Sequence, residues 1–180
     1  INIIMDGPPA MTLGVEPARP GVMDAPPRRP EARILTGRRM AVLLFYGFIM
    51  AAGTLALFAH ARPQGEAYAL TLAFTTFVLF QFFNIFNARA DHGSAFSVGF
   101  LRNRWLWLAL AGVLGLQVVV VHWAPAQVVF DTVDLALADW LLAAAVASSV
   151  LWLEELRKLI QRLIGLGRRR VGRPVYFYGN

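Results

Sequence analysis

The sequence has no cysteine and few charged residues. The absence of cysteine excludes a disulfide scaffold, a thiolate metal site and cysteine catalysis. With three histidines, no HExxH motif and no paired metal-ligand spacing, a zinc enzyme is not expected either. Only 16% of the 180 residues are charged, whereas 57% are hydrophobic. This composition points away from a water-soluble globule.

Four long apolar stretches organise the chain. They cover about residues 40–61, 67–88, 105–124 and 135–156. Met40 to Ala59 contains no charged residue, and at ~1.5 Å per residue a helix of that length crosses a hydrocarbon core roughly 30 Å thick. The fourth stretch contains Asp139, Glu154 and Glu155, but these lie near its ends, at interfacial depth. The sequence therefore predicts an all-α, polytopic transmembrane helix bundle that has the lipid bilayer as a partner.

The basic residues follow these stretches. Sixteen of the 17 Lys and Arg residues fall in residues 14–39, 89–104 and 157–180, and the other connections contain only Arg62. Because short cytoplasmic loops retain Lys and Arg, loop 14–39 and the C-terminus are predicted to be cytoplasmic. Nucleic-acid binding is not expected, since residues divided among three loops form no single basic face.

Two segments lie outside the apolar stretches. Residues 14–39 form a Pro/Arg-rich loop whose prolines favour an extended, stiff path. Residues 157–180 are expected to form a basic cytoplasmic tail, without periodicity from Gly165 onward. The chain begins at Ile1 inside an apolar run, with neither an initiator Met nor a signal peptide, which indicates a part of a longer protein.

The first residues combine an amide and a carboxylate in an apolar segment. Asn2 and Asp6 are four apart, so a helix would place both on one face. Gly7, Pro8 and Pro9 are predicted to interrupt that helix and to free backbone carbonyls. With Asn and Asp oxygens, such carbonyls can replace the hydration shell of a hard cation. The alternative is that Asp6 is an interfacial carboxylate beside a helix terminus.

These residues also resemble a known family. Residues 2–10 read Asn-Ile-Ile-Met-Asp-Gly-Pro-Pro-Ala, followed by Leu-Gly-Val-Glu-Pro at 13–17 and Met-Asp-Ala-Pro-Pro-Arg at 23–28. They closely resemble the sixth transmembrane helix and following loop of P-type cation ATPases, especially calcium pumps of the secretory-pathway Ca2+/Mn2+ type. Later segments resemble the eighth and tenth helices of that family, at residues 74–78, 83–87, 148–150 and 154–158.

The resemblance implies that this chain contains part of the ion-binding site of a longer pump, and that other domains of the pump bind ATP. Residues 1–13 would be the second half of a broken ion-binding helix, and residues 40–156 the last four membrane helices. Since the family's residues at the positions of Asn2 and Asp6 coordinate the transported ion, both are expected metal ligands, with Gln81 as at most an auxiliary. ATP and Mg2+ would be bound by upstream domains, so the partners are upstream transmembrane helices and a cytoplasmic phosphorylation domain. The chain contains neither Asp-Lys-Thr-Gly nor GxxxxGK[ST], and no catalytic or cofactor-binding residue is expected on it.

Departures from the family pattern bear on the ion. Met5 stands where two-site calcium pumps have Thr, and Gln81 where they have an acidic ligand, which favours a single site. The secretory-pathway pumps usually have Gln where this chain has Met11, and Asp where it has Gln81, which favours Ca2+ over Mn2+. Asn2 argues against Na+, because sodium-moving relatives typically have an acidic residue there. The expected function is ATP-driven export of Ca2+ from the cytoplasm.

Two alternatives stay open. The chain could belong to a pump for Na+, Mn2+ or another cation. It could instead be a stand-alone four-span structural or interaction membrane protein.

The composition also bears on the location of the protein. Its richness in Ala and Arg suits a high-GC bacterium, and hence a bacterial plasma membrane.

Other polar residues and glycines have simpler interpretations. Gln81 and Asn84, three apart on one helical face, could hydrogen-bond neighbouring helices instead of lying near the ion path. Solvated ion pairs are expected at the end of the fourth stretch, in Glu154 with Lys158 and Glu155 with Arg157. Interfacial positions are expected for His60 and His122, and helix packing for Gly112 and Gly115.

Overall fold

The computed structural model describes residues 2–16, 35–89, 95 and 102–171, and within them the side chains of 2–6, 38 and 165–171 lie outside the description. The described part contains no strand. Its helices are α1 (Asn2–Leu13), α2 (Gly37–Ala61), α3 (Glu66–Arg89), α4 (Arg104–His122), α5 (Ala124–Phe130) and α6 (Leu137–Val171), with a short 3-10 helix, η2 (Arg62–Gln64), after α2. The predictions for most of the Pro-rich loop and for the last residues of the tail fall outside the described residues.

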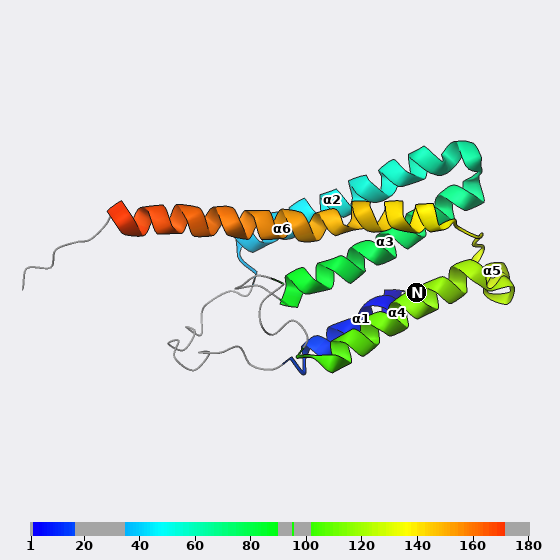
Figure 1. Ribbon diagram of the computed structural model, residues 1–180, viewed down its shortest axis with the longest axis horizontal. Coiled ribbons are helices and arrows are strands. Elements are labelled where there is room, and N and C mark those ends of the chain that lie inside the picture. Colours follow the sequence, from blue (N-terminus) through cyan, green and yellow to red (C-terminus); the bar gives the residue numbers. More distant parts are fainter. Residues whose placement is uncertain (1, 17–34, 90–94, 96–101, 172–180) are drawn as a thin grey trace, which may run out of the picture.

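Four of the described helices, α2, α3, α4 and α6, are long and apolar enough to cross a membrane. They lie roughly along one axis and alternate in direction, as Figure 1 shows. The short connections explain the alternation: only η2 and Gly65 separate α2 from α3, and Gly65 adopts a φ of 125°, which favours glycine. The predicted all-α polytopic bundle is confirmed.

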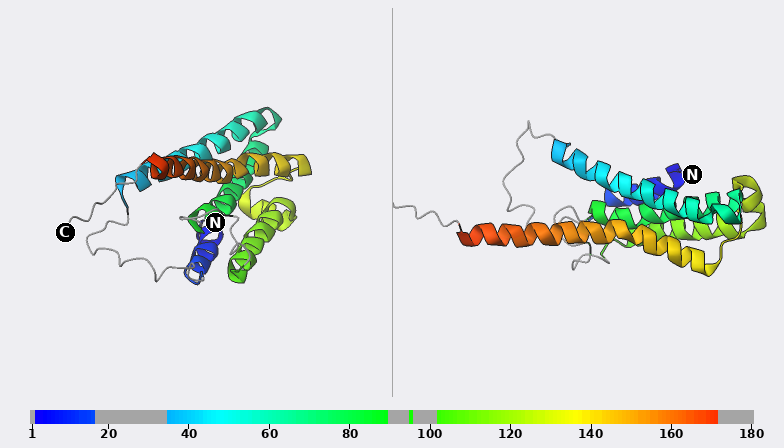
Figure 2. Two further views of the ribbon diagram at one scale, coloured as in Figure 1. Left: turned by 60° about the vertical axis from the view of Figure 1, so that its left-hand side comes forward. Right: turned by 90° about the horizontal axis from the view of Figure 1, so that it is seen from above.

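Helix α3 lies at the centre of the bundle. It packs against α1, α2, α4 and α6, whereas α2 touches neither α1 nor α4 within the described residues. Figure 2 shows α2 and α6 on one side of α3, and α1 with α4 on the other. The contact with α2 and α6 is close because Gly53 of α2 leaves room for the ring of Phe80, which is fully buried.

The ends of two predicted spans differ from the structure. The third ends at His122, because Trp123 adopts an extended conformation before Pro125 opens α5. The fourth continues as one helix from Leu137 to Val171, well into the segment expected to be an irregular tail. No proline interrupts it, and the apolar residues Leu159, Ile160, Leu163 and Ile164 recur at helical spacing.

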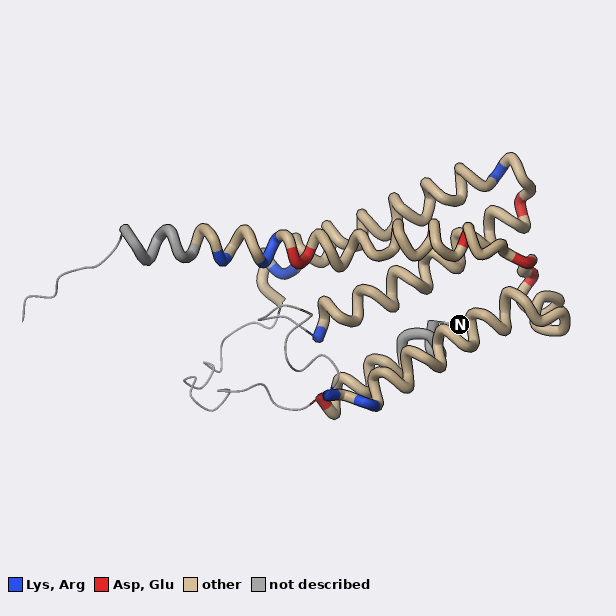
Figure 3. Tube along the Cα trace, viewed as in Figure 1, with Lys and Arg blue, Asp and Glu red and all other residues tan. Residues whose placement is uncertain are grey.

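The basic residues are concentrated at one end of the bundle. In Figure 3 most described Lys and Arg residues lie at the end where α1 and α3 finish and α2 and α4 begin. Arg62, in η2, lies at the opposite end, together with the acidic residues of the α5–α6 connection. The bundle therefore has one mainly basic end, as a membrane protein with one cytoplasmic face requires.

Candidate functional site

Helix α1 lies in the groove between α3 and α4. It packs mainly against α4 and also against α3, and within the described residues it makes no contact with α2 or α6. Figure 1 shows α1 beginning partway along α4 and running to the basic end of the bundle. The backbone of its first half, with Asn2 and Asp6, therefore lies inside the length of the bundle.

The two prolines do not interrupt α1. The prediction of a break at Gly7-Pro8-Pro9 is wrong, because the helix runs continuously from Asn2 to Leu13 with both prolines inside it. The proline φ of about −65° is itself helical, although each proline removes a helical hydrogen bond and its ring crowds the carbonyl four residues earlier. With no N–H on Pro8 or Pro9, the carbonyls of Ile4 and Met5 have no helical donor. The freed acceptors expected from a broken helix thus occur in an unbroken one.

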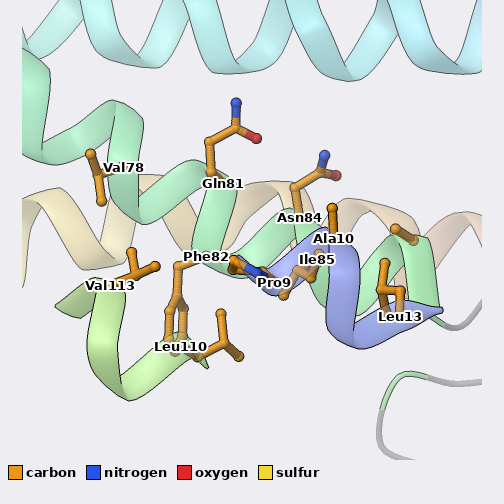
Figure 4. Close-up of a pocket in the computed structure, with 11 residues that line it drawn as sticks. Pro9, Ala10, Leu13, Val78, Gln81, Phe82, Asn84, Ile85, Leu110 and Val113 are labelled. Atoms are coloured by element: carbon orange, nitrogen blue, oxygen red, sulfur yellow. The ribbon is translucent and has the colours of Figure 1, made fainter. Parts of the chain in front are cut away.

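A cavity of about 280 Å³ lies where α1, α3 and α4 meet. Its lining is mostly apolar, and its members are Pro9, Ala10, Leu13, Val78, Gln81, Phe82, Asn84, Ile85, Ala88, Leu110 and Val113. Figure 4 shows the amides of Gln81 and Asn84 pointing to the same side of α3, away from Phe82 and Leu110. Gln81 lines the same cavity as Pro9 and Ala10, which belong to the helix that carries Asn2 and Asp6.

The amide residues of α3 differ in their partners. Asn87 donates through Nδ2 to the carbonyl of Val150 on α6, at 3.1 Å, and more weakly to Oδ1 of Asn84, at 3.5 Å. The side chain of Gln81 makes no hydrogen bond within the described residues, and it is half-buried. Helix-to-helix bonding is thus the role of Asn87, whereas the amide of Gln81 has no hydrogen-bond partner among the described residues.

The sequence argument missed a buried polar pair. Gln117 of α4 is fully buried and donates through Nε2 to Oγ1 of Thr75 on α3, at 3.0 Å. Its Oε1 atom has no partner among the described residues. Gln117 is the one polar residue between Trp107 and Val121, so its isolation in an apolar stretch was the available signal.

One of the two ion pairs predicted near the end of the fourth span is buried. Glu154 and Lys158 are only 5% and 7% exposed, so the prediction that this pair is solvated is wrong, whereas Glu155 and Arg157 are partly exposed. Glu154 accepts hydrogen bonds from the hydroxyl of Tyr46 on α2, at 2.5 Å, and from Arg157, at 2.7 Å. Helical spacing predicted that Glu154 and Lys158 are neighbours within α6. It could not predict that they are buried, which depends on contacts with other helices such as the one with Tyr46 of α2.

The histidine and glycine predictions have mixed outcomes. His122 lies at the end of α4, where Nδ1 contacts Oδ1 of Asp134 at 2.9 Å and Nε2 accepts from Trp140 at 3.2 Å. For Gly112 and Gly115 no described atom lies within 4 Å of a Cβ built at either, so their expected packing role stays a prediction. Gly53 has such a role, with Phe80 at 2.7 Å.

The described side chains do not form a metal centre by themselves. No three His, Asp or Glu residues gather within the described ranges. The side chains of Asn2 and Asp6 lie outside the described part, whereas their helix and the Gln81 face of the cavity lie within it. A cation site here would draw on α1 and on carbonyl and amide oxygens, which suits hard cations.

Known proteins similar to this chain are named as calcium-transporting ATPases. A sequence model of the family described as "Cation transporting ATPase, C-terminus" matches residues 1–160. The chain is 39% identical over 172 residues to Calcium-transporting ATPase 1 of Schizosaccharomyces pombe, covering 94% of this chain and 19% of that protein. It is 40% identical over 166 residues to the human Calcium-transporting ATPase type 2C member 2, covering 90% and 17%. For the bovine Calcium-transporting ATPase type 2C member 1 the identity is 35% over 177 residues, covering 97% and 18%. The chain thus spans less than a fifth of the length of these relatives.

Proposed function

The chain belongs to the family of cation-transporting ATPases, in which it corresponds to the C-terminal part. On this premise we propose that it forms the C-terminal membrane domain of an ATP-driven pump for Ca2+. The resemblance to P-type cation ATPases stated from residues 2–28 is confirmed. The relatives carry the name calcium-transporting, which supports Ca2+ as the transported ion. ATP and Mg2+ would bind domains upstream of this chain, with which the bundle would couple through neighbouring membrane helices.

Asp6 is proposed as the main ion ligand on the chain, with Asn2 as its partner. The observation that carries this proposal is the position of α1, which runs beside the cavity between α3 and α4. At ~1.5 Å per residue, Asp6 lies about 10 Å along the helix axis from Leu13. A carboxylate inside a membrane segment is energetically costly, and such residues usually have a function. This argues against an interfacial position for Asp6.

The backbone supplies further oxygen ligands at the same level. The carbonyls of Ile4 and Met5, which lack helical donors, lie within one turn of Asp6. Gln81 adds an amide on the facing helix that has no hydrogen-bond partner among the described residues, and an auxiliary role is proposed for it. A set of one carboxylate, amides and carbonyls is the kind of shell that Ca2+ accepts.

The decisive experiment replaces Asp6 by Asn in the intact pump. This change removes the negative charge and nearly preserves the shape, so loss of activity would report on charge. Ca2+-dependent ATP hydrolysis should fall by about two orders of magnitude, as expected when a binding carboxylate is lost. Asp131→Asn is the matched control, since Asp131 is exposed, and Asn tolerates its left-handed conformation. Near-normal Ca2+ affinity in Asp6→Asn would refute the site.

Gln81→Ala separates the auxiliary role from the main one. It should raise the Ca2+ concentration for half-maximal activity no more than about threefold, because a neutral amide contributes less than a carboxylate. Running the same series with Mn2+ tests the ion, since a larger response to Mn2+ than to Ca2+ would contradict the choice of Ca2+.

The chain is an integral membrane protein, and we propose that its basic end faces the cytoplasm. This orientation follows from the Lys and Arg distribution. Cysteines introduced at Thr36 and, separately, at Gln64 should then label from opposite sides of the membrane. The proposal of a bacterial plasma membrane rests on composition alone, because the relatives named above are fungal and mammalian.

A further inference from the structure

The end of α1 is held by polar residues from three separate segments. Glu16 follows α1, Arg89 is the last residue of α3, and Asn103 precedes α4. Oε1 of Glu16 accepts from Nε of Arg89 at 2.6 Å, and its Oε2 accepts from Nδ2 of Asn103 at 2.6 Å. One carboxylate therefore joins the end of α1 to the end of α3 and to the beginning of α4.

Asn103 uses both ends of its amide. Its Oδ1 accepts from the backbone N–H of Leu106 at 3.0 Å, which caps the N-terminus of α4. Its Nδ2 also donates to the carbonyl of Thr12 at 2.9 Å, near the C-terminus of α1. Asn103 is 3% exposed, so its rotamer is fixed by packing as well as by these bonds. Asn103 thereby fixes the position of the end of α1 relative to the start of α4.

The contacts are of the strong, directional kind. The side chain of Arg89 is 8% exposed and that of Glu16 is 25% exposed, so water screens the pair little. Charge-assisted hydrogen bonds of this length are about twice as strong as neutral ones. The apolar contacts of α1 are less restrictive, because the cavity leaves part of its side towards α3 unfilled.

We propose that Glu16, Arg89 and Asn103, here called the α1 clamp, position α1 along its axis relative to α3 and so set the ion affinity of the site. This inference rests on the proposed function, because the site that the clamp would position is the one on α1. A shift of α1 would move Asp6 away from Gln81 without altering either residue. The clamp residues are positioning residues and are not ligands.

Asn103→Asp tests the clamp without removing the cap of α4. Asp caps helices as well as Asn, but it cannot donate to Thr12 or Glu16 and it places a second negative charge beside Glu16. In the intact pump the Ca2+ concentration for half-maximal ATP hydrolysis should rise about tenfold, with the maximal rate changed less than twofold. Arg102→Gln is the control, because it makes the same change in net charge at an exposed neighbouring position.

The double variant Glu16→Gln with Asn103→Asp should recover part of the lost affinity, because it restores the hydrogen bond between positions 16 and 103 but not the one to the carbonyl of Thr12. In it the amide and the carboxylate have exchanged places. Gln at 16 can accept from Arg89 and donate to Asp at 103, which still caps α4. An unchanged affinity in Asn103→Asp, or a loss that the double variant does not reduce, would overturn the clamp.

A distance measurement tests the clamp independently of the ion. Spin labels can be attached at Met11 of α1 and Leu108 of α4, which are 79% and 64% exposed, in a pump without other reactive cysteines. Asn103→Asp should broaden or shift the distance distribution, and the double variant should restore it in part. An unaltered distribution would overturn the clamp. If the wild-type pump responds to neither Ca2+ nor Mn2+, the proposed function fails, and the distances alone decide the clamp.

Discussion

Helices α2, α3 and α6 form a closely packed unit, whereas α1 and α4 form a pair that leaves a cavity against α3. In the packed unit, Gly53, Ala143 and Ala147 let the helices approach, and the two alanines are fully buried. In the α1–α4 pair, polar residues at the ends and a cavity of about 280 Å³ take the place of such packing. The comparison suggests a rigid frame beside a helix that is held mainly at one end, where a small displacement can change a binding site.

The largest effect is expected from breaking the polar contact within the packed unit. Glu154→Ala removes the acceptor of Tyr46 and both acceptors of Arg157, and it leaves the buried Lys158 with Glu155 as its remaining described acid. The unfolding free energy should fall by about 3 kcal/mol, measured by unfolding in mixed detergent micelles. Glu66→Ala, in the exposed first turn of α3, should cost less than about 1 kcal/mol. Equal losses in the two variants would refute this account of the buried cluster.

A matched pair of glycine substitutions compares the two regions directly. Gly53→Val places atoms within 2.7 Å of the buried Phe80 ring and 3.1 Å of Val146, so it should separate α2 from α3 and α6. The cost should be about 2 kcal/mol. Gly115→Val, on α4, meets nothing within 4 Å in the described structure and should be within about 0.5 kcal/mol of the wild type. The comparison between regions would be wrong if Gly115→Val were the more harmful change.

A smaller effect is expected at the contact between α3 and α4. Gln117→Leu removes the 3.0 Å bond to Thr75 but also removes a buried Oε1 atom that has no described partner. Because hydrogen bonds between membrane helices contribute about 0.6 kcal/mol on average, the change in unfolding free energy should stay below about 1 kcal/mol. A loss above about 2 kcal/mol would mean that Gln117 has a role beyond joining the two helices.

The smallest effect concerns the connection between α5 and α6. A hydrogen bond from His122, with a second contribution from Gln127, holds the pKa of Asp134 below its ordinary value of 3.8. A carboxyl with a lowered folded-state pKa stabilises the protein above its unfolded-state pKa, and this stabilisation is lost as pH falls through the folded-state value. Asp134→Asn should therefore reduce the acid-induced decrease in melting temperature below about pH 4. Identical pH profiles of variant and wild type between pH 3 and 7 would contradict this.

Much of the architecture followed from the order of the residues. Uncharged runs such as Met40 to Ala59 are long enough to span a bilayer only as helices, because backbone groups must be paired within the hydrocarbon region. The motifs within residues 2–28, supported by later segments, also identified the family. These features are local, so they could be predicted without knowing which helices are neighbours.

Only part of the candidate site could be predicted from the sequence. Helical spacing placed Asn2 with Asp6 and Gln81 with Asn84, but it did not indicate that α1 continues through Pro8 and Pro9. The need for a break was inferred from the missing N–H groups, which the helix in fact tolerates at the loss of two hydrogen bonds. Similarly, a period of 3.6 residues paired Glu154 with Lys158 but could not reveal that Tyr46 covers them.

The sequence by itself determined the helices, their alternation across the membrane and the family. The tertiary structure decided which of the polar residues act together. Glu16, Arg89 and Asn103 are far apart in the chain, and their joint contact depends on three segments ending at the same level of the bundle. Gly53 acquires its importance from Phe80 and Val146, whereas Gly115 has no comparable neighbour in the described part. The type and spacing of residues can be read from the sequence, but the burial and the partners of each residue depend on which other parts of the chain pack against it.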